Sequence, residues 1–307
     1  MMKDLEPNGG AILITGPTAS GKSALALSLA KQHGGVVINA DSMQVYDTLR
    51  VLTARPADEE MEGIPHLLYG HVPAGELYST GDWLRSVQQL LPEIRHESRL
   101  PVFVGGTGLY FKALTGGLSE MPAIPTDLRE SLRARLIAEG AEPLHQELSR
   151  LDPVVAARLA VSDGQRIVRA LEVVLTTGRS IAEFQAATGP VIIDLATARK
   201  IVVLPERKVL HDRINRRFEI MLETGAVEEV EALLKLHLPA DATSMKAIGV
   251  AEIAAMLRGE MSRDQVIERG SALTRQYAKR QMTWFRNQMD DSWERFDPLG
   301  IAGQSLS

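Results

Sequence analysis

The chain has 307 residues, of which 45% are hydrophobic, 24% charged and 5% aromatic. This composition excludes a largely disordered or fibrous chain, and the length is typical of about two domains. Because the chain has no cysteine, it cannot contain a disulfide framework, a thiolate zinc site or a thiol nucleophile. No apolar run reaches the roughly 18 residues of a membrane span, and the first residues are acidic where a secretory signal is basic and then apolar. We therefore expect a soluble, cytoplasmic protein without a membrane partner.

The net charge of −5 argues against a protein that binds nucleic acid over its whole surface. The charge is uneven, however, because residues 263–286 carry six basic side chains and only two acidic ones. One basic face is therefore compatible with the acidic average.

Four short runs of branched apolar residues predict buried strands, at residues 11–15, 36–38, 101–105 and 201–204. Helical spacing over 23–33 follows the first of them and stops at two glycines. Strands that alternate with helices predict a parallel sheet.

Helical patterns dominate beyond Pro122 and Pro125, and again over residues 210–235 and 262–288. We read the first of these regions as a helical insertion between strands of the core. The expected domains are a core at 9–118 and 200–290, an insertion domain at 119–199, and a tail at 291–307.

The sequence GPTASGKS fits the phosphate-loop pattern GxxxxGK[ST] and stands between a strand and a helix, as that pattern requires. Its glycines let backbone N–H groups turn toward phosphate oxygens, and the helix N-terminus adds partial positive charge. Lys22 supplies a full charge, and Ser23 supplies a hydroxyl ligand for Mg²⁺. We therefore predict a di- or triphosphate site in an α/β fold with a P-loop NTPase-like parallel sheet. Its residues are Gly16, Pro17, Thr18, Ala19, Ser20, Gly21, Lys22 and Ser23.

Asp41 follows the second strand directly, at the edge of the sheet where the phosphate loop is expected. A carboxylate there can hold a metal or accept a proton from a nucleophile. It can equally cap a helix N-terminus, and the two roles are compatible. Thr107 lies in a glycine-rich turn after the third strand, within hydrogen-bonding reach of a phosphate or of Asp41.

A helix over residues 262–288 would gather polar and basic side chains within about 80° of one another, with large apolar side chains opposite. The basic face contains Arg275, Lys279, Thr283 and Arg286, and the apolar stripe contains Leu273, Tyr277 and Trp284. Such a helix can pack through one face and meet RNA phosphates with the other, although a solvated face is the commoner explanation.

Three motifs in this order, GPTASGKS (16–23), DSMQVY (41–46) and GGTGLY (105–110), resemble the tRNA dimethylallyltransferases. The resemblance continues through QRIVRALEV (165–173), RINRRF (213–218) and TRQYAKRQMTWFR (274–286). Members of that family move a dimethylallyl group from dimethylallyl diphosphate to N6 of the adenosine just 3′ of a tRNA anticodon, and release diphosphate with Mg²⁺. The absence of cysteine fits a bacterial-type member, without the zinc finger of eukaryotic relatives.

The resemblance implies roles for individual residues. The phosphate loop would hold the diphosphate of the prenyl donor, with Mg²⁺ on Ser23, and Arg217 would join Lys22 there. Asp41 would be the general base on the adenine amine, and Thr107 would assist at both substrates. The implied catalytic residues are Asp41, Thr107 and Arg217. The implied tRNA contacts are Asp41, Ser42, Met43, Gln44, Thr107, Arg129, Gln165, Arg166, Ile167, Val168 and Arg169.

Two features depart from this picture or compete with it. Arg55 stands where the family has a lysine, which keeps the charge but not the shape. His66 and His71 with Asp82 suggest a metal site, but their spacing has no metal-site logic, so ordinary polar roles are expected.

Three other functions use some of the same motifs: a small-molecule kinase, an adenylate dimethylallyltransferase, and a nucleotide-switched RNA-binding module. A small-molecule kinase gives no reason for the long basic helix, and an adenylate dimethylallyltransferase needs neither the helical insertion nor the basic face. A nucleotide-switched RNA-binding module does not require a general base at Asp41. We therefore expect tRNA and dimethylallyl diphosphate as substrates, Mg²⁺ as cofactor, and a monomer.

Overall fold

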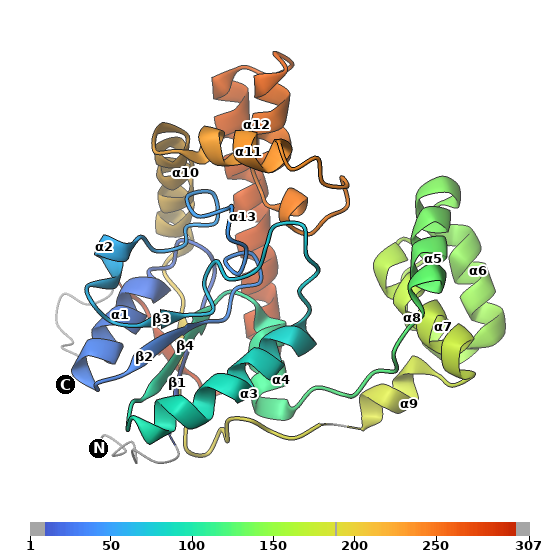
Figure 1. Ribbon diagram of the computed structural model, residues 1–307, viewed down its shortest axis with the longest axis horizontal. Coiled ribbons are helices and arrows are strands. Elements are labelled where there is room, and N and C mark those ends of the chain that lie inside the picture. The colour runs from blue at the N-terminus through green and yellow to red at the C-terminus, as the bar shows by residue number, and fades with distance from the viewer. Residues whose placement is uncertain (1–9, 188, 299–307) are drawn as a thin grey trace. The chain divides into compact units, whose positions relative to one another are not determined.

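Six parallel strands form one sheet within residues 10–187 and 189–298, the part of the chain that the computed structural model describes (Figure 1). Their order across the sheet is β3-β2-β4-β1-β5-β6. The strands are β1 (Ile12–Thr15), β2 (Val36–Asn39), β3 (His66–Leu67), β4 (Pro101–Gly105), β5 (Arg199–Val203) and β6 (Glu294–Phe296). The four predicted strands and the predicted parallel α/β core are confirmed, since β1, β2 and β4 are buried along their whole length.

Two strands were not predicted. β3 is only two residues long, and β6 is an edge strand with two exposed residues of three, so neither has the apolar run that marks a buried strand. β6 pairs with β5, with Glu294 opposite Ile201, and thus the expected tail at 291–307 is wrong for these residues. Residues 299–307 of that tail lie outside the described part.

The chain divides into two compact units, one made of the chain up to Thr115 and from Ile192 onward, the other of Gly116–Val191. The insertion expected at 119–199 overlaps the second unit, but residues 192–199 belong to the first. The first unit holds the sheet and these helices: α1 (Lys22–Gln32), α2 (Asp58–Met61), α3 (Thr80–His96), α4 (Gly108–Gly116), α10 (Arg207–Glu223), α11 (Ala226–Leu234), the 3₁₀ turn Ser244–Lys246, α12 (Val250–Leu257) and α13 (Arg263–Gln288).

α13 runs beside α10, and α11 and α12 pack across one end of this pair (Figure 1). The residues of α13 that are buried are Val266, Gly270, Ser271, Ala278, Gln281 and Phe285. The expected apolar stripe of Leu273, Tyr277 and Trp284 is half-buried, and Trp284 packs against Gly108. The fully buried residues of α13 lie beside this stripe. Small residues among them let the helices approach closely: a Cβ on Gly270 would collide with the ring of Phe218.

The ends of β2 and β4 are held close together. A Cβ on Gly105 would lie 2.0 Å from the carbonyl oxygen of Ala40, so only glycine permits this approach. Beneath it, the fully buried Trp83 donates from Nε1 to the carbonyl of Asn39 at 2.7 Å. Its ring stacks on Tyr110, with centroids 4.3 Å apart. These contacts fix the strand ends from which the site is built.

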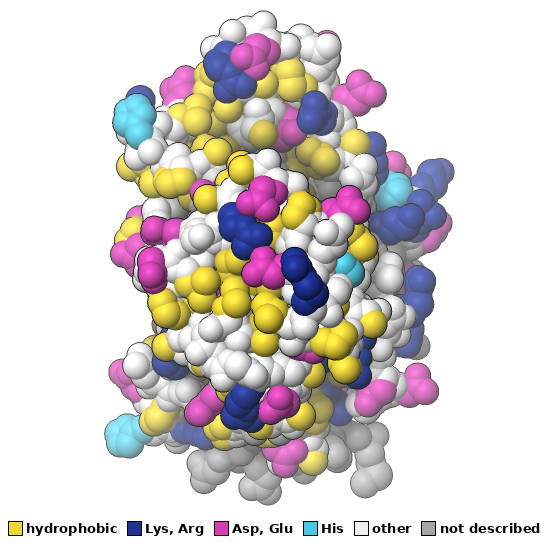
Figure 2. All heavy atoms as spheres, turned by 90° about the vertical axis from the view of Figure 1, so that its right-hand side faces the viewer, with side chains coloured by type: hydrophobic (Ala, Val, Ile, Leu, Met, Phe, Trp, Pro, Cys, Tyr) yellow, Lys and Arg dark blue, Asp and Glu magenta, His cyan; other side chains and the backbone are white. Residues whose placement is uncertain are grey.

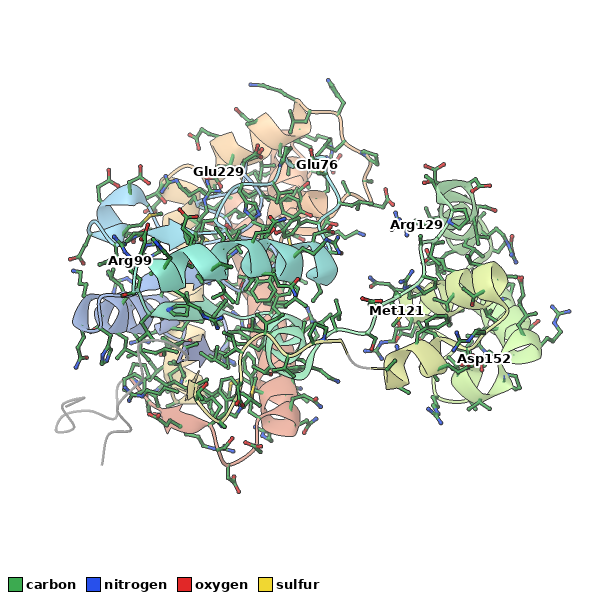
Figure 3. The ribbon with its side chains drawn as sticks, turned by 60° about the horizontal axis from the view of Figure 1, so that its bottom comes forward. Glu76, Arg99, Met121, Arg129, Asp152 and Glu229 are labelled. Atoms are coloured by element: carbon green, nitrogen blue, oxygen red, sulfur yellow. The ribbon has the colours of Figure 1, made fainter. Side chains whose placement is uncertain are left out.

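The second unit is helical and has its own apolar core. Its helices are α5 (Thr126–Glu139), α6 (Ala141–Leu151), α7 (Pro153–Ala156), α8 (Gly164–Thr177) and α9 (Ile181–Ala186). Asp152, labelled in Figure 3, lies between α6 and α7. It accepts from the backbone N–H of Val155 at 3.1 Å and from the Ser180 hydroxyl at 2.6 Å. On the face seen in Figure 2, basic side chains stand beside acidic ones rather than in one basic patch.

Gly105→Ala tests the close contact between the ends of β2 and β4. The new methyl group has no room beside Ala40, so we expect the free energy of unfolding to fall by about 2 kcal/mol. Urea denaturation measures this free energy in both proteins. Gly116→Ala is the control because its Cβ would meet nothing within 4 Å. An equal effect of the two substitutions would contradict the proposed constraint.

Candidate active site

Two neighbouring cavities open in the first unit. The first, about 470 Å³, is lined by the phosphate loop and α10, through Thr18, Ala19, Ser20, Gly21, Lys22, Ser23, Ala24, Asp41, Gln44, Thr53, Ala54, Arg213, Arg216, Arg217 and Ile220. The second, about 320 Å³, has more large apolar side chains in its lining, beside three cationic ones. It is lined by Thr18, Asp41, Ser42, Met43, Leu52, Thr53, Ile214, Arg217, Phe218, Met221, Lys246, Ala247, Ile248, Thr274, Tyr277 and Arg280. Both lists include Thr18, Asp41, Thr53 and Arg217, so the cavities meet at these residues.

The phosphate loop has the conformation that its sequence predicts. It leaves β1 at Gly16, where a Cβ would lie 2.6 Å from the carbonyl oxygen of Val203, and enters α1 at Gly21, whose φ is +94°. Lys22 folds back so that Nζ donates to the carbonyl of Pro17 at 3.3 Å. The first turn of α1 contains no acidic residue and no side-chain cap. Its N–H groups and partial positive charge are thus available to an anion.

Lys22 and Arg217 bring two positive charges into the first cavity. Burial lowers the pKa of Lys22 to about 8, opposed by Asp41 and reinforced by Arg217. Burial likewise lowers the pKa of Arg217 to about 10, and Asp41 opposes this too. The guanidinium of Arg217 donates to the hydroxyl of Thr18, so α10 is tied to the phosphate loop. This concentration of cations fits a polyanionic ligand.

Asp41 is oriented by its own backbone surroundings. Its N–H donates to Oδ1 of Asn39 at 2.9 Å, and its Oδ1 accepts from the N–H of Met43 at 3.0 Å. Asp41 therefore caps a short turn, where the sequence also allowed a helix cap. Within the described residues, Oδ2 has no hydrogen-bond partner and is left to act on a ligand.

Thr107 holds the turn after Asp41. Its Oγ1 accepts from the N–H of Ser42 at 2.9 Å and donates to the Ser42 hydroxyl at 3.2 Å. The hydrogen bond to Asp41 considered from sequence is therefore replaced by two bonds to Ser42, and Thr107 does not line either cavity.

Gln281 is a site residue that the sequence did not reveal. From α13, its Oε1 accepts from the N–H of Thr18 at 2.9 Å, and its Nε2 donates to the carbonyl of Gly106 at 3.0 Å. This buried amide thus joins the phosphate loop to the end of β4. The only feature of the sequence that could have revealed Gln281 is its polar side chain among the buried positions of α13.

The expected tRNA contacts in the second unit separate into two groups. Gln165 and Arg166 are exposed on α8, whereas Ile167 and Val168 are buried in the core of the unit. The side chains of Ile167 and Val168 are therefore not presented to a ligand in this structure, and the tRNA contact expected at these two positions stays a prediction. Helical geometry explains this burial, since Ile167 and Val168 lie on the inner face of α8.

Arg129 and Arg169 share one buried carboxylate, Glu172, which is 5% exposed. Arg169 Nη1 lies 2.8 Å from Glu172 Oε2, and Arg129 Nε lies 3.7 Å from Oε1. Each arginine side chain keeps about a third of its surface exposed, at 36% and 35%. The cluster carries one net positive charge near the surface.

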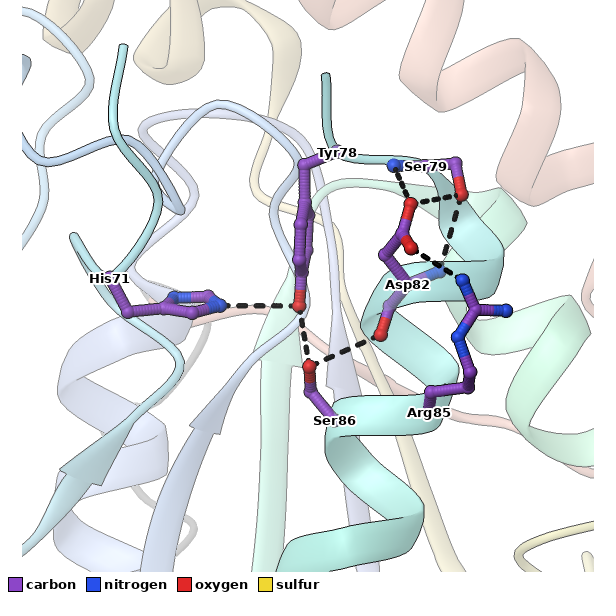
Figure 4. Close-up of polar contacts among 6 residues, drawn as sticks. All are labelled: His71, Tyr78, Ser79, Asp82, Arg85 and Ser86. Atoms are coloured by element: carbon purple, nitrogen blue, oxygen red, sulfur yellow. Dashed lines mark hydrogen bonds and ion pairs between the residues drawn. The ribbon is translucent and has the colours of Figure 1, made fainter. Parts of the chain in front are cut away.

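His71 and Asp82 interact with neighbouring side chains (Figure 4). His71 Nε2 lies 3.2 Å from the Tyr78 hydroxyl, while Asp82 accepts from Ser79 and pairs with Arg85. No group of three His, Cys, Asp or Glu side chains in the described ranges is placed to hold a metal ion. Likewise, no helix within those ranges is long and apolar enough to cross a membrane.

The lowered pKa of Lys22 predicts pH-dependent anion binding. Lys22 loses its charge as the pH rises through about 8, so the affinity for inorganic diphosphate should fall by up to about tenfold between pH 8 and 9. In Lys22→Arg the charge persists, so this fall should disappear. Calorimetry over the pH range measures both proteins, and the variant corrects for ionisation of the ligand itself. An identical pH dependence in both would refute the role of Lys22.

Comparison with known proteins places these features in a family. The family model described as IPP transferase matches residues 44–288, and a second, described as Isopentenyl transferase, matches residues 9–71. The tRNA dimethylallyltransferase of Agrobacterium fabrum is 70% identical over 298 residues, which cover 97% of this chain and 100% of the relative.

Two solved structures are similar in fold. The tRNA isopentenylpyrophosphate transferase of Bacillus halodurans has 36% identity and a TM-score of 0.67, over 94% of this chain and 90% of that one. A eukaryotic dimethylallyltransferase acting on tRNA has 26% identity and a TM-score of 0.81, over 94% of this chain and 74% of that one. The chain therefore belongs to the IPP transferase family.

Proposed function

We propose that this protein transfers a dimethylallyl group from dimethylallyl diphosphate to N6 of the adenosine 3′-adjacent to the anticodon of tRNA, with release of diphosphate. The observation that carries this proposal is the position of Asp41. It lies where the cationic cavity of the phosphate loop meets the second cavity, called the apolar cavity here for the side chains of Leu52, Phe218 and Tyr277 in its lining. The family membership and the 70% identical relative support the same reaction.

The cationic cavity suits the diphosphate. Cleavage of the allylic C–O bond leaves negative charge on the departing diphosphate, and fixed cations there stabilise the transition state. Lys22 and Arg217 are fixed in this way, by hydrogen bonds to Pro17 and Thr18 of the loop. The N–H groups of α1 add uncharged donors.

The apolar cavity suits the acceptor base and the prenyl group. Leu52, Phe218 and Tyr277 are among its lining residues, and they give flat or apolar surfaces to a base that has left its stack. An adenine held there would place its exocyclic amine toward Oδ2 of Asp41. That oxygen can accept the proton as the new N–C bond forms.

Mg²⁺ is part of the proposal. Ser23 lines the cationic cavity, so its hydroxyl is available beside the phosphate oxygens of a ligand. Hard oxygen ligands of this kind, completed by water, are those that Mg²⁺ prefers. When bound, the ion would neutralise charge on the leaving diphosphate.

For tRNA, we propose contacts from the second unit through Gln165 and Arg166, with Arg129 and Arg169. Exposed cations on α13, Lys279 among them, add phosphate contacts. We propose that the protein acts as a monomer. A cytoplasmic location follows from the proposed substrate.

Asp41→Asn tests the proposed base. Asparagine keeps an oxygen for the N–H of Met43, so the turn should persist while proton acceptance is lost. We expect the rate constant for label transfer from dimethylallyl diphosphate to tRNA to fall by roughly 10²–10⁴, with tRNA binding retained. Single-turnover kinetics and filter binding measure the two quantities.

Asp47→Asn is the matched control, because it removes an exposed carboxylate from the same loop. Its rate should stay close to that of the unaltered protein. If Asp41→Asn retained full activity, a different group would have to accept the proton. If it lost tRNA binding in equal measure, Asp41 would be a binding residue only.

Arg166→Gln tests the RNA contact of α8. Arg166 is 75% exposed, so its removal should leave the fold intact. Each phosphate contact contributes about 0.7–0.9 to the slope of log Kd against log salt concentration, and the variant should lose about that much. Arg150→Gln, on the exposed surface of α6, is the control and should keep the slope. Equal slopes for all three proteins would place the RNA elsewhere.

A further inference from the structure

The segment from Leu49 to Arg55 forms a wall that both cavities share. Leu52 and Thr53 line the apolar cavity, and Thr53 and Ala54 line the cationic one. The segment is a tight turn rather than part of a helix or strand, and it includes Ala54 in the left-handed region with φ of +54°. A turn of this kind needs support from outside itself.

That support comes from a single carboxylate on α11. Oε1 of Glu229 accepts from the N–H of Arg50 at 3.0 Å and of Val51 at 2.7 Å. Its Oε2 accepts from the N–H of Leu52 at 3.0 Å. Three consecutive backbone donors converge on one charged group, an arrangement that resembles anion binding at a helix N-terminus. The residues joined in this way are about 178 positions apart in the chain.

The turn in turn sets the orientation of Gln44. Nε2 of Gln44 donates to the carbonyl of Thr53 at 2.9 Å and to that of Ala54 at 3.0 Å. Both amide hydrogens are thus occupied, and Oε1 has no hydrogen bond to a described residue. Gln44 lines the cationic cavity, so the turn determines which amide atom a ligand meets there.

Arg55 closes the other end of the turn. Its Nη1 donates to the carbonyl of Tyr46 at 3.0 Å and its Nη2 to that of Asp47 at 3.2 Å. Burial lowers the pKa of Arg55, and the charge of Glu229 is the largest influence that opposes this. The two opposite charges therefore support each other as well as the turn.

We propose that Glu229 is a positioning residue for the transfer reaction. From α11 it fixes the turn 49–55, and through this turn it sets the wall of both cavities and the amide of Gln44. The inference rests on the proposed function, because it concerns the rate of the same transfer.

The role can be separated from a general contribution to stability. α11 docks through Ala226, Val230 and Leu233, which are fully buried in an apolar cluster. Helix packing of this kind does not depend on Glu229, which is only half-buried at the edge of the cluster. Loss of its carboxylate should therefore loosen the turn and leave α11 in place.

The test compares Glu229→Gln and Glu229→Ala with Glu228→Gln, which removes the same charge from an exposed position in the same helical turn. In Glu229→Gln the remaining oxygen can still accept from the N–H groups of Arg50 and Val51. The new NH₂ group, however, is itself a donor and cannot accept from the N–H of Leu52. We expect kcat/KM for prenyl transfer to tRNA to fall roughly tenfold in this variant and roughly a hundredfold in Glu229→Ala. Glu228→Gln should match the unaltered protein.

Two further readouts distinguish positioning from unfolding. The affinity for inorganic diphosphate should stay within about twofold and the thermal midpoint within about 5 °C, since Lys22, Arg217 and the core are untouched. Hydrogen exchange at the amides of Val51 and Leu52 should accelerate in Glu229→Ala and not in Glu228→Gln.

The inference is overturned if Glu229→Ala transfers the prenyl group as fast as Glu228→Gln, or if its losses of rate, diphosphate affinity and thermal midpoint all occur together. If the unaltered protein transfers no label to tRNA, the proposed function fails instead. The exchange rates then still decide whether Glu229 holds the turn.

Discussion

The site depends on two cations that share one cavity. Lys22 and Arg217 lie close enough for each to be affected by Asp41, and burial lowers the pKa of both. Holding them together without a ligand costs free energy, and the Asp41 carboxylate opposes that cost. A bound diphosphate offsets this cost, because its negative charge neutralises both cations. The phosphate loop and α10 are therefore stabilised most when the donor is bound. The departure of diphosphate in the reaction then uses the same charges.

Other contacts in the first unit fix the positions of Lys22, Arg217 and Asp41 relative to one another. Gly105 brings the end of β4 against Ala40, just before Asp41. Gln281 reaches from α13 to both the phosphate loop and the carbonyl of Gly106. Glu229 holds the turn 49–55, which lines both cavities. Elements from most of the chain thus converge on one point between the cavities.

The sequence was sufficient to locate the phosphate loop, Asp41 and the buried strands. Each of these has a short motif or apolar run that depends only on neighbouring residues in the chain. Gln281 and Glu229 act on residues 263 and about 178 positions away, and no periodicity marks such contacts. β6 was missed because an exposed edge strand lacks an apolar run. Ile167 and Val168 were assigned to tRNA with their neighbours, although the spacing of α8 already turns them inward.

The account is tested most directly by incubation of the purified protein with unmodified tRNA, Mg²⁺ and radiolabelled dimethylallyl diphosphate. Parallel reactions contain AMP in place of tRNA, or ATP without an acceptor. The account predicts label in tRNA alone, at one adenosine beside the anticodon by nuclease mapping. Label in AMP would point to transfer onto free nucleotides. No label in any reaction, with ATP consumed, would contradict the account and assign the phosphate loop to a kinase or a switch.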